Sequence, residues 1–286
     1  MNESILPIIE VEELLKISQH ENLVIVDAGS GFESGYKEMH LDGALFVDLN
    51  TQLSNIKKDV TNGGRHPLPT VKEFSKTLYS LGITNKSHVI VYDNKNGANS
   101  AARFWWMLKA IGHDKVQVLN GGFQYAEIKG FPINSKLVIP KDVAAYKFTE
   151  WKFTQAGMFE VEKYAQDKKY MIIDVREKER YNGTIEPIDL IAGHIPGAIN
   201  IPFSTNLNSN GLFKTANELK NRYQTIFGAL NFNNIIVHCG SGVTACHTLL
   251  AISYAGLEMP KLYVGSWSEW SRNNKPIVNI RLNLKQ

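Results

Sequence analysis

Cysteine is scarce in this chain of 286 residues, which contains only two, Cys239 and Cys246. So few cysteines argue against a small secreted fold held together by disulfide bonds and favour a reducing compartment. We therefore expect a cytoplasmic protein. Neither cysteine stands in a Cys/His cluster with the spacing of a zinc site, so the sequence implies no metal and no cofactor.

An excess of one charge and long apolar runs are also missing. The chain has 31 Lys and Arg residues against 28 Asp and Glu residues, a formal net charge of +3. This balance provides no field strong enough to indicate nucleic acid or an anionic membrane as a partner. No apolar stretch approaches the roughly 20 residues that span a bilayer. Residues 1–7 lack the basic region and apolar run of a secretory signal, so we expect none.

The chain instead repeats itself, and its length is sufficient for two domains. Segments of the first half have counterparts in the second half in the same order: 23–28 with 171–175, 40–45 with 194–199, 88–93 with 234–239, and 118–123 with 262–267. A series of echoes in one order indicates two copies of one structural unit.

Each half alternates short apolar runs with amphipathic stretches. The runs 23–27 and 171–174 end in Asp and are typical of buried parallel strands. Helical patterns cover 71–81, 101–111 and 244–254. This alternation predicts an α/β fold with two tandem domains, each a parallel sheet flanked by helices.

The two predicted domains differ at one position that matters for function. We place them at 1–135 and 150–286, joined by a linker at 136–149. The repeat aligns Cys239 with Asp93, each at the end of a predicted strand. Because ligands of open parallel sheets bind beyond the carboxyl ends of the strands, only the second domain has a nucleophile at the favoured place. We expect a catalytic C-terminal domain and a non-catalytic N-terminal domain.

Cys239 opens the loop Cys-Gly-Ser-Gly-Val-Thr between a predicted strand and a predicted helix. Gly240 and Gly242 let this loop turn tightly with its backbone N–H groups pointing inward. The helix N-terminus behind the loop also favours negative charge. We therefore expect the sulfur to be largely the reactive thiolate. The alternative, a cysteine that only fills space in the core, fits Cys246 better because that residue lies inside the helix.

With this loop, the sequence resembles the rhodanese family, and within it the two-domain thiosulfate and 3-mercaptopyruvate sulfurtransferases. Besides 239–244, family-like segments are found at 40–48, 101–106, 119–123, 174–176, 193–198 and 265–270. The resemblance implies two tandem rhodanese-like domains and a sulfur atom carried as a persulfide on Cys239. It also implies a small anionic sulfur donor, and as acceptor either cyanide or a thiol such as that of a thioredoxin-like protein.

The resemblance implies functions for further residues. Arg180 would hold the carboxylate or sulfonate-like oxygens of the donor. The loop residues Gly240, Gly242, Val243 and Thr244 would bind the transferred sulfur. Loops of this composition go with 3-mercaptopyruvate, whereas thiosulfate enzymes tend to place Arg and Lys directly after the cysteine. The loop thus favours mercaptopyruvate as the donor.

Mercaptopyruvate enzymes of the family also use a Ser–His–Asp relay near the cysteine. Ser241 matches the Ser and His66 the His, but Asn50 stands at the position of the Asp, with Asp48 two residues away. These enzymes often have a second Arg where this chain has Asp189. The departures leave thiosulfate:cyanide sulfur transfer as the alternative activity.

Two other functions share features with the loop. Cysteine phosphatases have an Arg after the five residues that follow the cysteine, whereas this chain has Ala245 there and lacks the cation that grips phosphate. A persulfide relay protein that serves one partner without turnover would need the same loop as an enzyme. Turnover of a small donor separates the relay from the enzyme.

Overall fold

The computed structural model describes residues 5–29 and 33–280. Contacts divide the chain into two units. The first comprises the chain up to Asn55 together with Leu68–Phe153 and Ser209–Phe213. The second comprises Ile56–Pro67, Thr154–Asn208 and the chain from Lys214 onwards. Residues 56–67 therefore pack with the second half of the chain, which nothing in the repeat pattern indicates.

A parallel sheet of five strands forms the centre of the first unit, in the order β1-β6-β5-β2-β4. The strands are β1 (Ile8–Ile9), β2 (Leu23–Gly29), β4 (Ala44–Asp48), β5 (His88–Tyr92) and β6 (Val116–Leu119). A small antiparallel pair consists of β3 (His40–Leu41) and β7 (Ile133–Asn134). The helices are α1 (Val11–Ile17), α2 (Glu33–Glu38), α3 (Val71–Ser80), α4 (Ser100–Ala110) and α5 (Gly122–Ile128).

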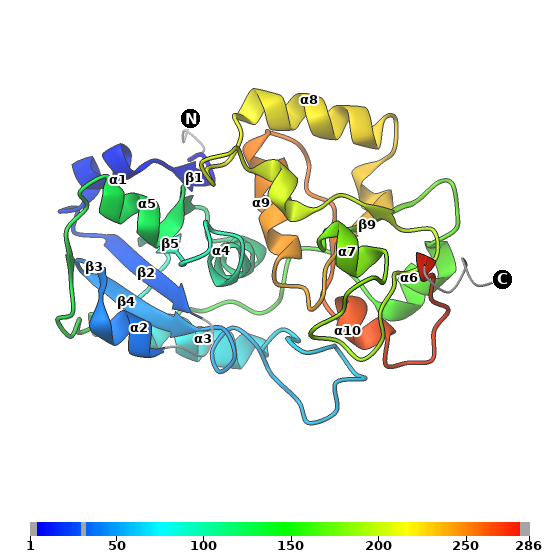
Figure 1. The fold of residues 1–286 in the computed structure, drawn as a ribbon. Helices are drawn as coiled ribbons and strands as arrows, with labels where there is room; N and C mark the ends of the chain where they lie inside the picture. The colour runs from blue at the N-terminus through cyan, green and yellow to red at the C-terminus, as the bar shows by residue number, and fades with distance from the viewer. Residues whose placement is uncertain (1–4, 30–32, 281–286) are drawn as a thin grey trace. The chain divides into compact units, whose positions relative to one another are not determined.

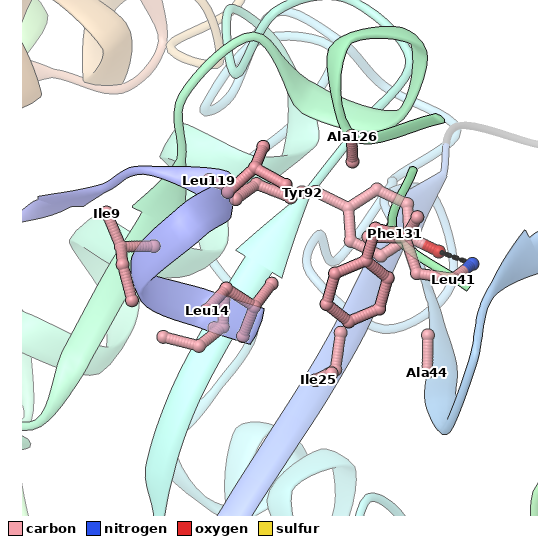
Figure 2. Packing of buried hydrophobic residues seen from close by; sticks show 11 residues of the cluster. Ile9, Leu14, Ile25, Leu41, Ala44, Tyr92, Leu119, Ala126 and Phe131 are labelled. Atoms are coloured by element: carbon pink, nitrogen blue, oxygen red, sulfur yellow. Dashed lines mark hydrogen bonds between the residues drawn. The ribbon is translucent and has the colours of Figure 1, made fainter. Parts of the chain in front are cut away.

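Helices cover both faces of this sheet; in Figure 1, α1 and α5 lie on one side of β2 and α3 lies on the other. On the first side, Leu14 of α1 and Ala126 of α5 join Ile25 of β2 in one apolar core (Figure 2). The hydroxyl of Tyr92 reaches through this core and accepts the N–H of Leu41 at 3.1 Å. The sheet is thus buried on both faces, as the continuous apolar runs predict.

The second unit repeats the first. Its parallel sheet has the order β8-β12-β11-β9-β10, with strands β8 (Gln155–Ala156), β9 (Met171–Asp174), β10 (Ile199–Asn200), β11 (Ile235–His238) and β12 (Lys261–Tyr263). Its helices are α6 (Met158–Tyr164), α7 (Lys178–Tyr181), α8 (Ala216–Phe227), α9 (Ala245–Tyr254) and α10 (Ser266–Trp270), with 3₁₀ turns at Phe203–Asn206 and Phe232–Asn234. The strands correspond as the sequence echoes predict: β2 to β9, β4 to β10, β5 to β11, and β6 to β12. The predicted α/β fold with two parallel sheets is confirmed.

The repeat extends to a side-chain motif in each unit. His40 stacks on Tyr36 with ring centroids 4.1 Å apart, and its Nδ1 is 2.7 Å from the carbonyl oxygen of the same tyrosine. His194 stacks on Tyr181 at 3.7 Å, and its Nδ1 is 2.8 Å from that tyrosine's carbonyl oxygen. Each tyrosine hydroxyl donates to a carbonyl at the start of the next strand segment, that of Ala44 or Ala198. These histidines therefore fix turns within their own units.

The segment between β7 and β8 contains no helix or strand, but it is anchored to the first unit. The rings of Phe148 and Trp151 pack on Phe74 of α3, with centroids 6.0 and 5.3 Å away. The hydroxyl of Ser75 donates to the carbonyl of Tyr146 at 2.6 Å. Aromatic packing thus ties down a stretch that composition alone marks as a linker. No helix in the described ranges has the length and apolar character needed to cross a membrane.

Asp27, in the second half of β2, should make the stability of the first unit depend on pH. Burial raises the pKa of its carboxyl to about 7, and the charge of Asp93 acts in the same direction. Between about pH 4 and pH 7 the folded state therefore holds a proton that the unfolded state has lost. The free energy of unfolding should fall across this range as pH rises, by up to a few kcal/mol.

Asp27→Asn imitates the protonated carboxyl and should flatten this dependence. We expect the variant to match the wild type near pH 4 and to be more stable at pH 8, as measured by urea unfolding over a pH series. Asp114→Asn, which removes an exposed carboxylate, serves as the control. If the free energy of unfolding of the Asp27 variant changed with pH as steeply as that of the wild type, the carboxyl of Asp27 in the wild type would be ionised in the folded protein.

Candidate active site

Cys239 lies at the carboxyl edge of the second sheet. It directly follows β11, the central strand, and precedes α9 by the short loop that the sequence predicts. It is a free cysteine, and 3 % of its surface is exposed. The thiol is therefore held by the rigid centre of the fold at the place where open parallel sheets bind ligands.

Gly242 allows the loop to turn. Its φ is +73°, and a Cβ there would lie 2.4 Å from the carbonyl oxygen of Val264. Both the conformation and the close approach therefore require glycine. Val243 is buried, and its carbonyl accepts the N–H of Cys246, so the first helical turn of α9 already begins within the loop. Thr244 is the residue that precedes α9.

The carbonyl groups at the start of the loop are turned away toward α10. The N–H of Trp267 donates to the carbonyl of Cys239 at 3.0 Å, and the N–H of Ser268 donates to that of Gly240 at 2.8 Å. These bonds use two N–H groups at the N-terminus of α10 that would otherwise need partners. They also remove two carbonyl dipoles from the surroundings of the sulfur.

Ser266 supports Cys239 and was not recognised from the sequence. It adopts φ +53°, which is uncommon for a residue other than glycine. Its Oγ accepts the N–H of Cys239 at 3.2 Å and donates to the carbonyl of Tyr263 at 2.8 Å. At the corresponding position the first unit has Gly122, with φ +62°. The sequence did contain a signal for Ser266, because the second copy of the repeat has a serine where the first copy has a glycine.

The segment 56–67 reaches the loop as part of the second unit. The N–H of Gly63 donates to Oε1 of Glu269 at 2.8 Å, and the N–H of Arg65 donates to Oγ of Ser268 at 3.0 Å. Both acceptors belong to α10, which also holds the cysteine loop. One short helix therefore positions both segments.

This segment places His66 against the loop. Nδ1 of His66 is 2.8 Å from Oγ of Ser241, a hydrogen bond whose donor depends on the tautomer of the ring. Asn50 and Asp48 belong to the first unit, where Oδ1 of Asp48 accepts the N–H of Asn50 at 2.9 Å. The predicted contact of either residue with His66 stays a prediction.

Asp189 binds three arginine side chains, and its own side chain is fully enclosed. Its Oδ1 accepts Nε of Arg65 and Nη1 of Arg272, both at 3.0 Å. Its Oδ2 accepts Nη2 of Arg65 and Nη2 of Arg180, both at 3.3 Å. Arg65 and Arg272 were missed by sequence reasoning because nothing in their local sequence marks them.

Glu186 and Asp174 extend this network. Oε1 of Glu186 accepts Nη2 of Arg180 at 2.6 Å, and its Oε2 accepts Nη1 of Arg176 at 3.2 Å. Arg176 also pairs with Asp174 at 2.6 Å and donates to the carbonyl of Gly193 at 2.7 Å. Burial is the largest single influence on Asp174 and would raise its pKa, but the charges of Arg176 and His238 and the hydrogen bonds from Arg176 together outweigh it and hold that pKa below its usual range. Arg176 therefore anchors loops, whereas Arg180 retains an exposed edge, with 18 % of its side chain accessible.

Other residues near the loop are enclosed in the core. Cys246, His238 and His247 are fully buried, and burial lowers the pKa of both histidines. The Sγ of Cys246 donates to the carbonyl of Gly242 at 3.3 Å. Within residues 5–29 and 33–280, no three His, Cys, Asp or Glu side chains are grouped so as to hold a metal ion.

Asp93 fills the corresponding position of the first unit with its own carboxylate. The side chain is fully buried, and each oxygen accepts two backbone N–H groups of the following residues, at 2.8–3.2 Å, namely those of Lys95, Gly97, Asn99 and Ala101. Burial raises the pKa of Asp93, and these donors limit the rise. With both oxygens engaged as acceptors, the carboxylate is the form that fits. The loop after β5 therefore binds an anion, and this anion is the carboxylate of Asp93 itself.

Comparison with known proteins agrees with the two-unit fold. The model of the rhodanese-like domain matches residues 10–127 and 159–273. A probable 3-mercaptopyruvate sulfurtransferase of Pseudomonas aeruginosa is 38 % identical over 239 residues, 82 % of each chain. Rat thiosulfate sulfurtransferase is 36 % identical over 86 % of this chain and 82 % of its own.

Solved structures agree as well. The 3-mercaptopyruvate sulfurtransferase of Leishmania major has a TM-score of 0.78 at 29 % identity, over 92 % of this chain and 74 % of its own. SseA of Escherichia coli has a TM-score of 0.74 at 30 % identity, over 93 % of this chain and 100 % of its own. Family models match both halves, and relatives above 30 % identity span more than four-fifths of the chain. The chain therefore belongs to the rhodanese family of sulfurtransferases, enzymes that here consist of two rhodanese-like domains.

Proposed function

We propose that this protein transfers a sulfur atom from 3-mercaptopyruvate to a thiol or to cyanide, through a persulfide on Cys239. Sulfur transfer is the activity of the family, and the relative from Pseudomonas aeruginosa is named for this donor. The second domain carries the chemistry. The first domain is non-catalytic, because Asp93 stands where the nucleophile would be and binds its own loop.

The hydrogen bond between His66 and Ser241 is the observation that carries the choice of donor. When the Cys239 thiolate attacks the sulfur of mercaptopyruvate, an S–S bond forms and the C–S bond of the donor breaks with its electron pair on carbon. The resulting enolate becomes pyruvate by taking up a proton, and the donor's thiol gives up its own. Ser241 and His66 provide a hydroxyl and an imidazole that can pass this proton between the two atoms.

Thiosulfate needs no such proton transfer. Its S–S bond breaks with the electron pair on sulfite, a stable anion that leaves as it is. A hydrogen bond between a serine of the loop and a histidine therefore supports mercaptopyruvate as the donor. Rat thiosulfate sulfurtransferase is nearly as similar in sequence, so thiosulfate:cyanide transfer is the alternative activity. A relay protein that holds the persulfide for one partner is the other alternative.

Binding of the donor and of the persulfide falls to different groups. Arg180 has 18 % of its side chain exposed beside the loop and can hold a carboxylate through its remaining N–H donors. The backbone N–H groups of the loop, from Gly240 to Thr244, stabilise the outer sulfur of the persulfide. An acceptor thiolate or cyanide then attacks that outer sulfur, and the S–S bond breaks with its electron pair returning to Cys239. No cofactor takes part in this cycle.

Ser241→Ala should separate the two donors. We expect kcat with 3-mercaptopyruvate to fall about 100-fold, the usual range for loss of acid–base catalysis, and kcat with thiosulfate to stay within about threefold. Pyruvate release and thiocyanate formation measure the two reactions, with dithiothreitol and cyanide as acceptors. His66→Gln should show the same pattern, and Ser253→Ala, in the same unit at the far end of α9, is the control.

Equal losses with both donors would show that Ser241 only shapes the loop. A wild type that prefers thiosulfate would support the alternative activity. A wild type that forms the persulfide with either donor but releases it only to one protein would support the relay.

A further inference from the structure

In the second unit, the guanidinium of Arg176 lies in a cradle of four residues. It pairs with Asp174 at 2.6 Å and with Glu186 at 3.2 Å, and it donates to the carbonyl of Gly193 at 2.7 Å. It also lies over the ring of Trp267, with its central carbon 4.6 Å from the ring centroid. Carboxylates, a carbonyl and an aromatic face thus surround one cation, which is a favourable environment for it.

The first unit has most of this cradle but not the arginine. The repeat aligns Asp27, Met39 and Phe123 with the first carboxylate, the carbonyl residue and the tryptophan. The second carboxylate has no counterpart, because the stacked tyrosine precedes its histidine by 4 residues in the first unit and by 13 in the second. Gly29 stands at the position of the arginine. A Cβ on Gly29 would lie 2.5 Å from Cε2 of Phe46, so the ring of Phe46 blocks the start of a longer side chain there.

A cavity lies among these counterparts. It has a volume of about 410 Å³, and its lining includes Asp27, Met39 and Phe123. Tyr36 and Phe46 add two more aromatic side chains to the lining. Sites of this volume bind small molecules, and aromatic faces attract cations. The first unit therefore has an open space where the second unit holds its own guanidinium.

Asp27 is the charged group that a ligand would meet inside this cavity. Burial raises the pKa of its carboxyl to about 7, a hydrogen bond with Tyr92 acts in the opposite direction, and the charge of Asp93 adds to the rise. Within residues 5–29 and 33–280, no basic side chain forms an ion pair with Asp27. The other charged residues of the lining, Glu38 and Lys95, are exposed and opposite in sign. A cation in the cavity would stabilise the ionised carboxyl, as the arginine does in the second unit.

We propose that the first unit binds a small organic cation in this cavity, through a guanidinium or alkylammonium group that pairs with Asp27 and stacks on Phe123. The ligand supplies the cation that the chain itself supplies in the second unit. Its stem is short and apolar, because Met39 and Phe46 line the same space. The site is separate from the chemistry of Cys239 and gives the first domain a binding function of its own.

Propylguanidine copies the arginine side chain and is the probe, and propylurea is its neutral control of nearly the same shape. Calorimetric titration of the full chain at pH 8 should give a Kd of about 1 mM or lower for propylguanidine and binding at least about tenfold weaker for propylurea. At pH 6 the Kd of propylguanidine should be about tenfold higher, because only about a tenth of a carboxyl with a pKa of about 7 is then ionised. Absence of binding, or equal binding of the two compounds, would overturn the proposal.

Asp27→Asn should bind propylguanidine at least about tenfold more weakly than the wild type at pH 8, and equally at pH 6 and pH 8. Asp114→Asn, which removes an exposed carboxylate of the same unit, is the control and should keep Kd within about twofold. Phe123→Leu should raise Kd about threefold through loss of the aromatic face. His40, which stacks on Tyr36, is another titratable group of this region. A dependence on pH that persists in Asp27→Asn would assign the titration to another group such as His40 and overturn the role of Asp27.

Two further measurements identify the source of the cation and its independence from sulfur transfer. N-acetylarginine methylamide carries the same guanidinium on a peptide backbone, and it should bind more weakly than propylguanidine. Tighter binding would point to an arginine of a partner chain and overturn the assignment to a small molecule. Cys239→Ser should bind propylguanidine with the Kd of the wild type, so the cation site can be tested whatever the outcome for the persulfide.

Discussion

Cys239→Ser should abolish sulfur transfer, with a loss of at least about 1000-fold for either donor. Serine fits the space of the cysteine, but its hydroxyl is a far weaker nucleophile at neutral pH and cannot form a persulfide. After incubation with donor alone, mass spectrometry should find one added sulfur atom on Cys239 of the wild type and none on the variant. Kinetics with dithiothreitol and with cyanide measure the loss.

Cys246→Ser is the matched control for this experiment. Cys246 lies on α9, fully buried, and its Sγ donates to the carbonyl of Gly242. A serine hydroxyl can make the same bond, so activity should stay within about threefold of the wild type. Retained activity in Cys239→Ser would refute the persulfide mechanism. Equal losses in both variants would show that the substitutions act through the fold.

Asp93→Ala should have the largest effect on stability, because it leaves four backbone N–H groups, two of them in buried hydrogen bonds and two in part-buried ones, without their acceptor. Each unsatisfied buried donor costs on the order of 1–3 kcal/mol, so we expect a loss of at least about 3 kcal/mol even if the loop partly rearranges. Urea unfolding measures the loss. Hydrogen exchange of β5 and α4 should show that it is concentrated in the first unit.

Asp114→Ala is the control for Asp93, since it removes an exposed carboxylate whose ion pair with Lys109 contributes at most about 1 kcal/mol. Asp93→Asn should be nearly as harmful as Asp93→Ala, because one end of an amide is a donor and faces two N–H groups. If Asp93→Asn kept wild-type stability, the four N–H bonds would not be what holds this loop.

Much of the fold could be predicted because the repeat and the apolar runs are local properties of the sequence. Strands β2, β5, β9 and β11 follow from runs that end at a polar residue, and the correspondence between the strands of the two units follows from the repeated segments. The matching motifs of Tyr36 with His40 and Tyr181 with His194 could not be predicted in the same way. The tyrosine precedes its histidine by 4 residues in the first unit and by 13 in the second, so no fixed spacing connects them.

In the candidate site, too, the residues that are close in sequence could be predicted and the long-range contacts could not. Cys239, Ser241 and the glycines share one loop, and their arrangement follows from the strand and helix on either side. Arg65 and Arg272 reach Asp189 from 124 and 83 residues away in the sequence. Their contact depends on tertiary packing, which periodicity does not encode. Asp189 was interpreted as a departure in donor binding, whereas the structure makes it the common acceptor of three arginines.

The packing of residues 56–67 with the second unit has a consequence for how such a chain can be divided. A fragment that starts at residue 150 contains one whole copy of the repeat by sequence, yet it lacks the imidazole of His66 that contacts Ser241 and the guanidinium of Arg65 beside Gly240. The second copy of the repeat therefore does not contain the whole candidate site by itself. Cutting the chain between the two copies would therefore remove groups that residues 56–67 place beside the cysteine loop.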